Sequence, residues 1–160
     1  MVKIKKILRP NIELVKELLV DIRKPDLKEL LMGPLAPFDA VWESIDNSLH
    51  CYVVRDSQKH LLAIFGIGLG RVEVTNTMAT PIWFLGTNRA YKHTRALVYY
   101  GKQYCERFIN EVGPLCNFIW IGNEPSIRYI SHLGATLFNV VPMGKKEEPF
   151  IPFILSEVNK

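Results

Sequence analysis

The amino-acid sequence predicts an α+β fold, built as an α/β-type sandwich, in which a mixed sheet of about seven strands carries helices on both faces. Two observations support this prediction. The order of apolar patterns along the chain is strand, two or three helices, three strands, a long helix, strand, helix and two strands. The segment Cys116–Ala135 has the pattern of a strand, a turn and a helix in succession.

That segment is the most specific part of the chain. The apolar run Asn117–Ile121 fits a strand covered on both faces, and Gly122 ends it. Asn123 can accept hydrogen bonds from the first free N–H groups of a helix, and Pro125 is tolerated in the first turn. Gly134 is placed to end the helix in a left-handed cap. We therefore expect a helix that starts at Asn123 and ends at Gly134.

The first third of the chain is expected to form one strand followed by two or three helices. Val2–Leu8 alternates basic and apolar residues as a half-exposed strand does. Apolar residues then recur at helical spacing over Ile12–Ile22 and, after a proline, over Leu27–Leu31. Phe38–Ser48 is expected to form a third helix.

The later elements follow the same rules. Leu49–Arg55 and Leu61–Leu69 are expected to pair as a hairpin, and the glycines near the end of the second strand indicate a bulge or a close backbone approach. Ala90–Val112 has the longest helical pattern. The remaining expected strands are Pro81–Gly86, Thr136–Val141 and Phe150–Leu155.

Length and composition limit the function classes. The 160 residues suit one domain spanning positions 1–160, with a core that needs no staples. No apolar stretch approaches the roughly 20 residues that cross a bilayer, and the basic amino terminus lacks the apolar region of a secretory signal. We expect no membrane association and a cytoplasmic protein. The net charge of +4 is dispersed, so nucleic-acid binding has no support.

The cysteines and histidines indicate neither disulfides nor metal. Cys51, Cys105 and Cys116 are an odd number without paired spacing, which favours reduced, buried thiols. The four histidines are scattered rather than clustered with cysteine. We predict no metal site.

Three blocks of sequence carry a resemblance to a known family. They are Arg9-Pro10, Ile82-Trp83-Phe84-Leu85-Gly86-Thr87, and Asn117–Asn123 followed by Ser126-Ile127-Arg128-Tyr129 and Leu133-Gly134-Ala135. With these blocks the chain resembles the GNAT (GCN5-related N-acetyltransferase) superfamily over most of its length. Within that superfamily it is similar to small GNAT-like proteins of short-tailed bacteriophages, including one described as an internal virion protein.

The resemblance implies a cofactor and a site. GNAT enzymes transfer an acetyl group from acetyl-CoA to an amine. The pantetheine lies between two splayed strands, and the pyrophosphate lies at the start of the long helix. Carried over to this chain, the implied acetyl-CoA-binding residues are Leu85, Gly86, Thr87, Arg89, Lys92, Arg95 and Asn123.

Two departures from the family pattern concern chemistry. The glycine-rich phosphate loop is missing, so that Arg89, Lys92 and Arg95 would contact phosphates through their side chains. The tyrosine that often returns a proton to the thiolate would fall at Ile130, whereas Tyr129 is rotated from it by about 100° and is expected in the core. No catalytic residue is assigned.

Several residues allow more than one interpretation. Glu73 and Glu43 are both candidates for a general base, and no spacing selects one. Asn123 is favoured as a helix cap over a cofactor ligand, and the three basic residues as a solvated turn over phosphate ligands. Trp83 and Trp120 are favoured as core residues. Arg128 either extends into solvent or pairs with an acid.

Two functions follow from the resemblance and its departures. One is an acetyl-CoA-dependent N-acetyltransferase acting on an amine acceptor in the host cytoplasm. The other is a catalytically inactive GNAT-fold protein that acts in virion assembly or binds a phage or host protein. The missing loop favours the second function and the fold favours the first.

Overall fold

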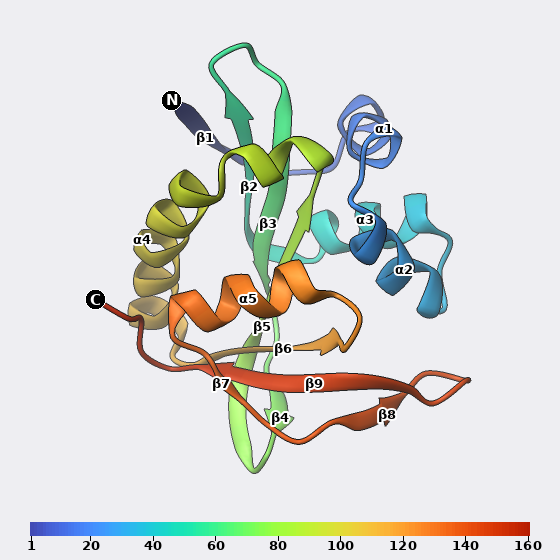
Figure 1. The fold of residues 1–160 in the computed structure, drawn as a ribbon, viewed down its shortest axis with the longest axis vertical. Helices are drawn as coiled ribbons and strands as arrows, with labels where there is room; N and C mark the ends of the chain where they lie inside the picture. The colour runs from blue at the N-terminus through green and yellow to red at the C-terminus, as the bar shows by residue number, and fades with distance from the viewer. The chain divides into compact units, whose positions relative to one another are not determined.

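The computed structural model describes residues 1–160 (Figure 1). The chain forms two compact units. The first unit comprises Met1–Leu69 and Trp83–Ala96, and the second comprises Gly70–Ile82 and Leu97–Lys160. Strand β5 and helix α4 each contribute residues to both units. A single domain over the whole chain stays a prediction.

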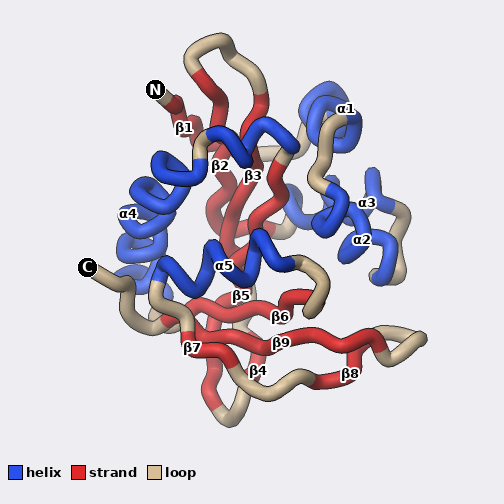
Figure 2. The backbone as a smooth tube through the Cα atoms, viewed as in Figure 1, coloured by secondary structure: helices blue, strands red, loops and turns tan.

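The first unit combines a sheet with three helices, shown red and blue in Figure 2. Its elements are β1 (Val2–Ile7), α1 (Ile12–Val20), α2 (Lys24–Met32), α3 (Pro37–Asp46), β2 (Ser48–Asp56), β3 (Leu61–Gly68), the end of β5 (Thr77–Gly86), the 3₁₀ helix η1 (Asn88–Lys92) and the first residues of α4 (Thr94–Val112). Strands β1, β2 and β3 are antiparallel neighbours, and β3 is followed by β5 in the strand order.

The core of the first unit lies between this sheet and the helices. Val15 of α1 and Val41 of α3 are fully buried against a sheet face that includes Val53 of β2 and Ile64 of β3. The predicted strands and the helical spacing of the apolar residues therefore meet in one cluster. Trp83, predicted as a core residue, packs against that cluster, and its indole N–H donates to Ser48 Oγ at 2.9 Å.

Gly66 confirms the predicted close backbone approach in β3. A Cβ at this position would lie 2.5 Å from the backbone oxygen of His50 on the neighbouring strand. The register between β2 and β3 also shifts between Ser48 and His50, which is the irregularity expected near the glycines.

The second unit is a mixed sheet with two helices. Its elements are β4 (Val72–Val74), the first part of β5, most of α4, β6 (Leu115–Trp120), α5 (Glu124–Leu133), β7 (Thr136–Leu137), β8 (Val141–Met143) and β9 (Glu148–Leu155). Strand β6 is parallel to β5 and antiparallel to β9, while β7 and β8 both pair with β9.

Helix α5 begins and ends where the sequence predicted. Asn123 caps it by accepting from the Ser126 N–H, and Gly134 ends it at φ 112° in the left-handed region. Its apolar side packs Ile130 against Ile119 of β6 and Phe153 of β9. The strand, turn and helix predicted for Cys116–Ala135 are confirmed.

Three predictions about elements were wrong in detail. The long helix begins at Thr94 rather than Ala90, because Ala90 N–H bonds to Thr87 O and His93 N–H to Ala90 O, the i→i+3 pattern of a 3₁₀ turn. The strand β4 was not predicted. The strand expected over Thr136–Val141 is split into β7 and β8, because Pro152 of β9 accepts a hydrogen bond from Phe138 but has no N–H to donate.

The burial of the cysteines agrees with the prediction. Cys51, Cys105 and Cys116 are all free and buried, as predicted. None of the helices combines the length and the apolar character that spanning a bilayer requires.

Candidate functional site

The predicted cofactor residues at the end of β5 are held by the first unit itself. Leu85 and Thr87 are buried. The Thr87 N–H donates to Leu62 O at 2.9 Å, and Thr87 Oγ1 donates to Leu61 O at 2.7 Å. The polar groups of Thr87 therefore join the end of β5 to the start of β3.

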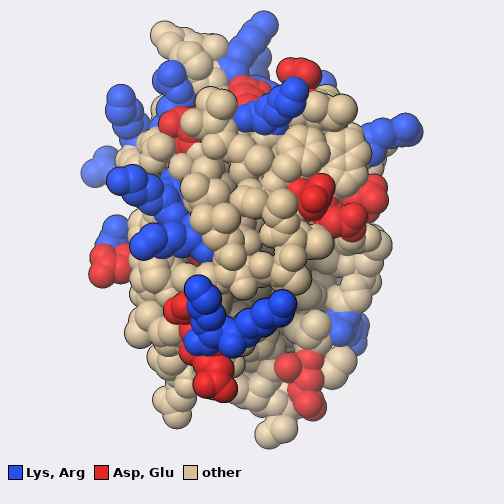
Figure 3. Space-filling model, turned by 90° about the vertical axis from the view of Figure 1, so that its right-hand side faces the viewer, with Lys and Arg blue, Asp and Glu red and all other residues tan.

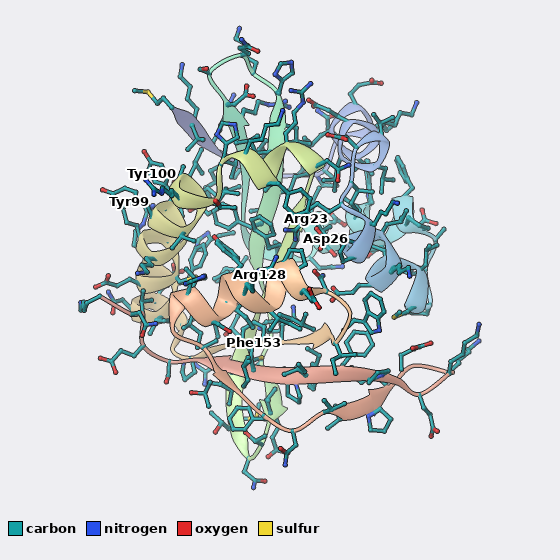
Figure 4. All side chains as sticks on the ribbon, in the orientation of Figure 1. Arg23, Asp26, Tyr99, Tyr100, Arg128 and Phe153 are labelled. Atoms are coloured by element: carbon teal, nitrogen blue, oxygen red, sulfur yellow. The ribbon has the colours of Figure 1, made fainter.

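Gly86 is bound by a buried ion pair at the start of α2, the Arg23–Asp26 pair. Arg23 Nε lies 2.8 Å from Asp26 Oδ2 and Arg23 Nη2 lies 3.0 Å from Asp26 Oδ1, so the contact is bidentate. Asp26 Oδ2 also accepts from the Gly86 N–H at 2.9 Å, and the Arg23 N–H donates to Gly86 O at 2.9 Å. Figure 4 shows the two labelled side chains next to each other.

The surroundings of Arg23 explain why position 86 is a glycine. A Cβ at Gly86 would lie 2.9 Å from Arg23 Nε, too close for a side chain. The guanidinium also lies 5.4 Å from the ring centroid of Phe84 and 5.7 Å from that of Tyr91. Arg23 is 5% and Asp26 1% exposed, so the ion pair is shielded from water. Its charge-assisted hydrogen bonds and the contacts of the guanidinium with the two aromatic rings are therefore strong.

The Asn88 N–H, the next donor along the chain, also has an acceptor within the first unit. The Asn88 N–H donates to Asp21 O at 2.9 Å, and its side-chain amide reaches Asp21 Oδ1 at 3.0 Å. The N–H groups of Gly86, Thr87 and Asn88 are thus all donated to acceptors within the first unit. A phosphate bound at this segment would have to use other donors.

Such donors lie immediately downstream. The side chains of Arg89, Lys92 and Arg95 are exposed on η1 and the first turn of α4. The first N–H groups of an α-helix have no intrahelical partner, which makes the amino terminus of α4 attractive to anions. In this segment the backbone N–H groups of Gly86–Asn88 are therefore engaged, whereas the three cationic side chains are exposed.

In the second unit, Asn117 ends the pairing of β5 with β6. The parallel register contains Thr80 with Leu115 and Pro81 with Cys116. At the next step the Asn117 amide is inserted instead, donating through Nδ2 to Ile82 O and accepting from the Phe118 N–H at 2.7 Å. The amide thus satisfies one backbone group of each strand where the ladder stops.

The sequence analysis treated Asn117 only as part of an apolar strand. The signal available was the single polar residue in the run Cys116–Ile121. A polar side chain on a strand that is covered on both faces needs hydrogen-bond partners, and the backbone of a neighbouring strand provides them.

The other predicted residue, Asn123, lies in the second unit and is 1% exposed. Its side chain caps α5, as described above, so the favoured interpretation as a helix cap fits the geometry. On the same helix Arg128 lies 3.7 Å from Glu124, and both side chains are largely exposed. A role of Asn123 toward acetyl-CoA stays a prediction.

Tyr129 has a structural role within the second unit. Its hydroxyl donates to Leu97 O of α4 at 2.8 Å. The phenol end of Tyr129 lies next to Gly101, where an added Cβ would collide with Tyr129 Oη. The hydroxyl proton is engaged by a backbone carbonyl, and the side chain is partly buried rather than part of the core that the sequence predicted.

We expect Gly101→Ala to lower the free energy of unfolding by about 1–3 kcal/mol, because the added methyl group displaces Tyr129. Tyr129→Phe should lower it by about 1 kcal/mol through loss of one hydrogen bond. In the double variant the hydroxyl that clashes with the added methyl group is gone. The double variant should therefore lose less free energy of unfolding than the two single variants lose together. Urea unfolding of all four proteins measures these values, and strictly additive losses would contradict the contact.

The two candidate general bases, Glu73 and Glu43, and the Cys116 thiol do not form a catalytic site. Glu73 lies exposed on β4, and Glu43 accepts from the Asn47 amide at 2.9 Å on α3. Burial raises the pKa of the Cys116 thiol to about 11, so that it stays protonated at neutral pH and is a poor nucleophile.

Comparisons with known proteins give similarity at the level of structure. Neither a model of a known protein family nor a curated protein sequence matches this chain. Among solved structures, it is similar to the aminoglycoside N(6′)-acetyltransferase from Legionella pneumophila, with a TM-score of 0.67, 12% identity, and 96% of this chain and 91% of that chain covered.

Two further structures agree. For the spermidine N-acetyltransferase from Vibrio cholerae in complex with CoA and spermine, the TM-score is 0.62 with 12% identity over 96% of this chain and 94% of that one. For the ribosomal-protein-S18-alanine N-acetyltransferase from Escherichia coli, it is 0.58 with 12% identity over 100% and 97%. The chain therefore has the mixed-sheet fold of GNAT N-acetyltransferases, as the sequence predicted.

Proposed function

We propose that this chain is a GNAT-type N-acetyltransferase that takes acetyl-CoA as donor and a primary amine as acceptor. The observation that carries the proposal is the insertion of the Asn117 amide where the pairing of β5 and β6 ends. The amide satisfies Ile82 O and the Phe118 N–H and so marks the point where the two strands separate. Beyond that point, separated strands leave further backbone donors and acceptors for a ligand, and the two amides of pantetheine are suited to them. The amine would then attack the thioester directly.

Phosphate binding in this proposal depends on side chains. Arg89, Lys92 and Arg95 would bind the pyrophosphate next to the amino terminus of α4, because the N–H groups of Gly86–Asn88 are already donated within the first unit. Leu85, Gly86 and Thr87 would shape the strand end, and Asn123 would fix the start of α5.

The same internal hydrogen bonds support a second candidate function. A loop whose N–H groups are all satisfied by Asp26, Leu62 and Asp21 needs no phosphate to be stable. In this alternative the chain is a catalytically inactive GNAT-fold protein, in the host cytoplasm or the virion, that binds a phage or host protein.

Calorimetric titration with acetyl-CoA separates the two functions. We expect a micromolar dissociation constant for acetyl-CoA and no comparable binding of ATP. Arg89→Ala/Lys92→Ala/Arg95→Ala should weaken acetyl-CoA binding at least tenfold, because three charge-assisted contacts are lost. The matched control, Lys3→Ala/Lys5→Ala/Lys6→Ala on β1, removes the same charge and should leave the affinity nearly unchanged.

Failure has a clear meaning here. If the unaltered protein binds no acetyl-CoA at millimolar concentration, the transferase proposal is wrong and the second function is favoured. If both triple variants lose affinity equally, the basic segment after β5 acts only through net charge.

A further inference from the structure

The first unit contains a groove between α2 and α3 that the proposed function does not use. Its volume is about 380 Å³. Its lining, which we call the α2–α3 groove, consists of Glu29, Leu30, Gly33, Pro34, Leu35, Ala40, Glu43, Ser44 and Asn47. That volume lies at the lower end of the range for small-ligand sites and is suited to one long side chain rather than a helix.

The floor of the groove is apolar. Leu30, Pro34, Leu35 and Ala40 contribute it, and Leu35 is 45% exposed. Leu31, next to the groove in sequence, is 61% exposed. Leu31 and Leu35 thus add to the apolar surface that the floor of the groove offers to a partner.

The charge of this segment is opposite to that of the chain. Residues 29–47 contain four acids, Glu29, Asp39, Glu43 and Asp46, and no lysine, arginine or histidine. The exposed Lys24 and Lys28 precede them on α2, and the whole chain has a net charge of +4. Figure 3 looks onto the side of α1, α2 and α3 and shows acidic side chains gathered beside uncharged surface. An exposed cation is therefore attracted to this part of the first unit.

The polar groups at the groove orient that attraction. Asn47 Nδ2 donates to Glu43 Oε2 at 2.9 Å, which fixes the Glu43 carboxylate, and Ser44 Oγ donates to Ala40 O. Glu43 and Asn47 are also at the carboxyl end of α3, where the helix dipole favours a positive charge. The groove thus combines an apolar floor with oriented negative charge.

We propose that the α2–α3 groove binds a lysine side chain presented by a flexible segment of a partner protein. The four methylene groups of lysine would cover the floor formed by Leu30 and Leu35, and the ammonium would lie between Glu29 and Glu43. A long apolar stem that ends in a compact, rotatable cation matches this lining. A planar guanidinium pairs best with both oxygens of one carboxylate, and Asn47 already occupies Glu43 Oε2.

The test uses the peptide acetyl-Ala-Leu-Lys-Leu-Ala-amide, titrated into the ¹⁵N-labelled full chain. We expect chemical-shift changes concentrated in residues 29–47 and a dissociation constant on the order of 1 mM or below. Glu29→Gln/Glu43→Gln should weaken binding about tenfold, since one ion pair at the half-buried Glu29 and one at the exposed Glu43 are lost. The matched control, Glu13→Gln/Glu157→Gln, removes equal charge from exposed positions outside the groove and should bind as the unaltered chain does.

A second peptide isolates the ammonium. The same sequence with Nε-acetyl-lysine keeps the alkyl chain but removes the charge, and it should bind at least tenfold more weakly. Equal affinity of the chain for the two peptides would overturn the assignment. So would equal affinity of the Glu29→Gln/Glu43→Gln variant and the unaltered chain for the lysine peptide. So would 1,5-diaminopentane binding as tightly as the peptide, or a dimer of the chain that the groove variant dissociates. None of these outcomes depends on acetyl-CoA binding.

Discussion

Replacing Asp26 by alanine is expected to lower the free energy of unfolding by about 3–5 kcal/mol, because it leaves the buried Arg23 guanidinium without a counter-charge. The change also removes the acceptor of the Gly86 N–H. Both consequences concern groups away from solvent, where an unpaired charge or donor has its full desolvation penalty. Chemical denaturation followed by circular dichroism measures the loss.

Two controls distinguish a buried charge from general damage at the start of α2. Arg23→Met/Asp26→Leu removes both charges and should be less destabilised than Asp26→Ala, since no ion is left unpaired. Glu124→Ala breaks the ion pair between Glu124, 77% exposed, and Arg128, 66% exposed. This change should alter the free energy of unfolding by less than about 1 kcal/mol. A double variant as unstable as the sum of its single variants would contradict the pair.

The same substitution is informative about function. If the Arg23–Asp26 pair holds the end of β5 and Tyr91 in place, loosening it displaces η1 and the cations Arg89 and Lys92. Under the proposed function, acetyl-CoA affinity should then fall in the folded Asp26→Ala protein as well as stability. The network thus links the packing of α2 to the candidate phosphate donors.

How far the sequence predicts this fold depends on whether a signal is local. The start and end of α5 follow from Asn123 and Gly134, because capping is decided within one helical turn. The position of Trp83 in the core and the close approach at Gly66 were also predictable, since a large apolar side chain and a glycine in a strand have few alternatives.

The Arg23–Asp26 pair was not predictable in this way. Arg23 and Asp26 appear in the sequence as ordinary charged residues around a proline, yet Asp26 binds a backbone group 60 residues away. The insertion of Asn117 likewise joins it to Ile82, 35 residues earlier. Contacts of this kind depend on which strand ends meet, and composition and periodicity do not contain that information.

The start of α4 lies between these cases. The helical pattern extends back to Ala90, but a 3₁₀ turn and a break at His93 replace its first turn. The reason is tertiary, because Asn88 is bonded to Asp21 and Tyr91 lies against Arg23. Propensity gave the right type of element and the wrong first residue.

Raising the pH from 8 to 10 is expected to lower the free energy of unfolding by about 4 kcal/mol through the three cysteines alone. Burial raises the pKa of the Cys51 and Cys105 thiols to about 12 and that of Cys116 to about 11, from an ordinary value of 9.0. Each folded-state pKa is raised, so above pH 9 the unfolded chain releases protons that the folded chain keeps. Each thiol then favours unfolding by slightly more than roughly 1 kcal/mol at pH 10.

Denaturation midpoints at pH 8, 9 and 10 test this, with Cys51→Ala as the matched variant. Whatever the variant loses at pH 8 by leaving a small cavity, its further loss on going to pH 10 should be about one third smaller than that of the unaltered chain, because one of the three ionising thiols is gone. Equal slopes would mean that Cys51 is accessible to water and ionises in the folded state. Because the comparison is between slopes, it separates the titration of the thiol from the packing of its side chain against the core of the first unit.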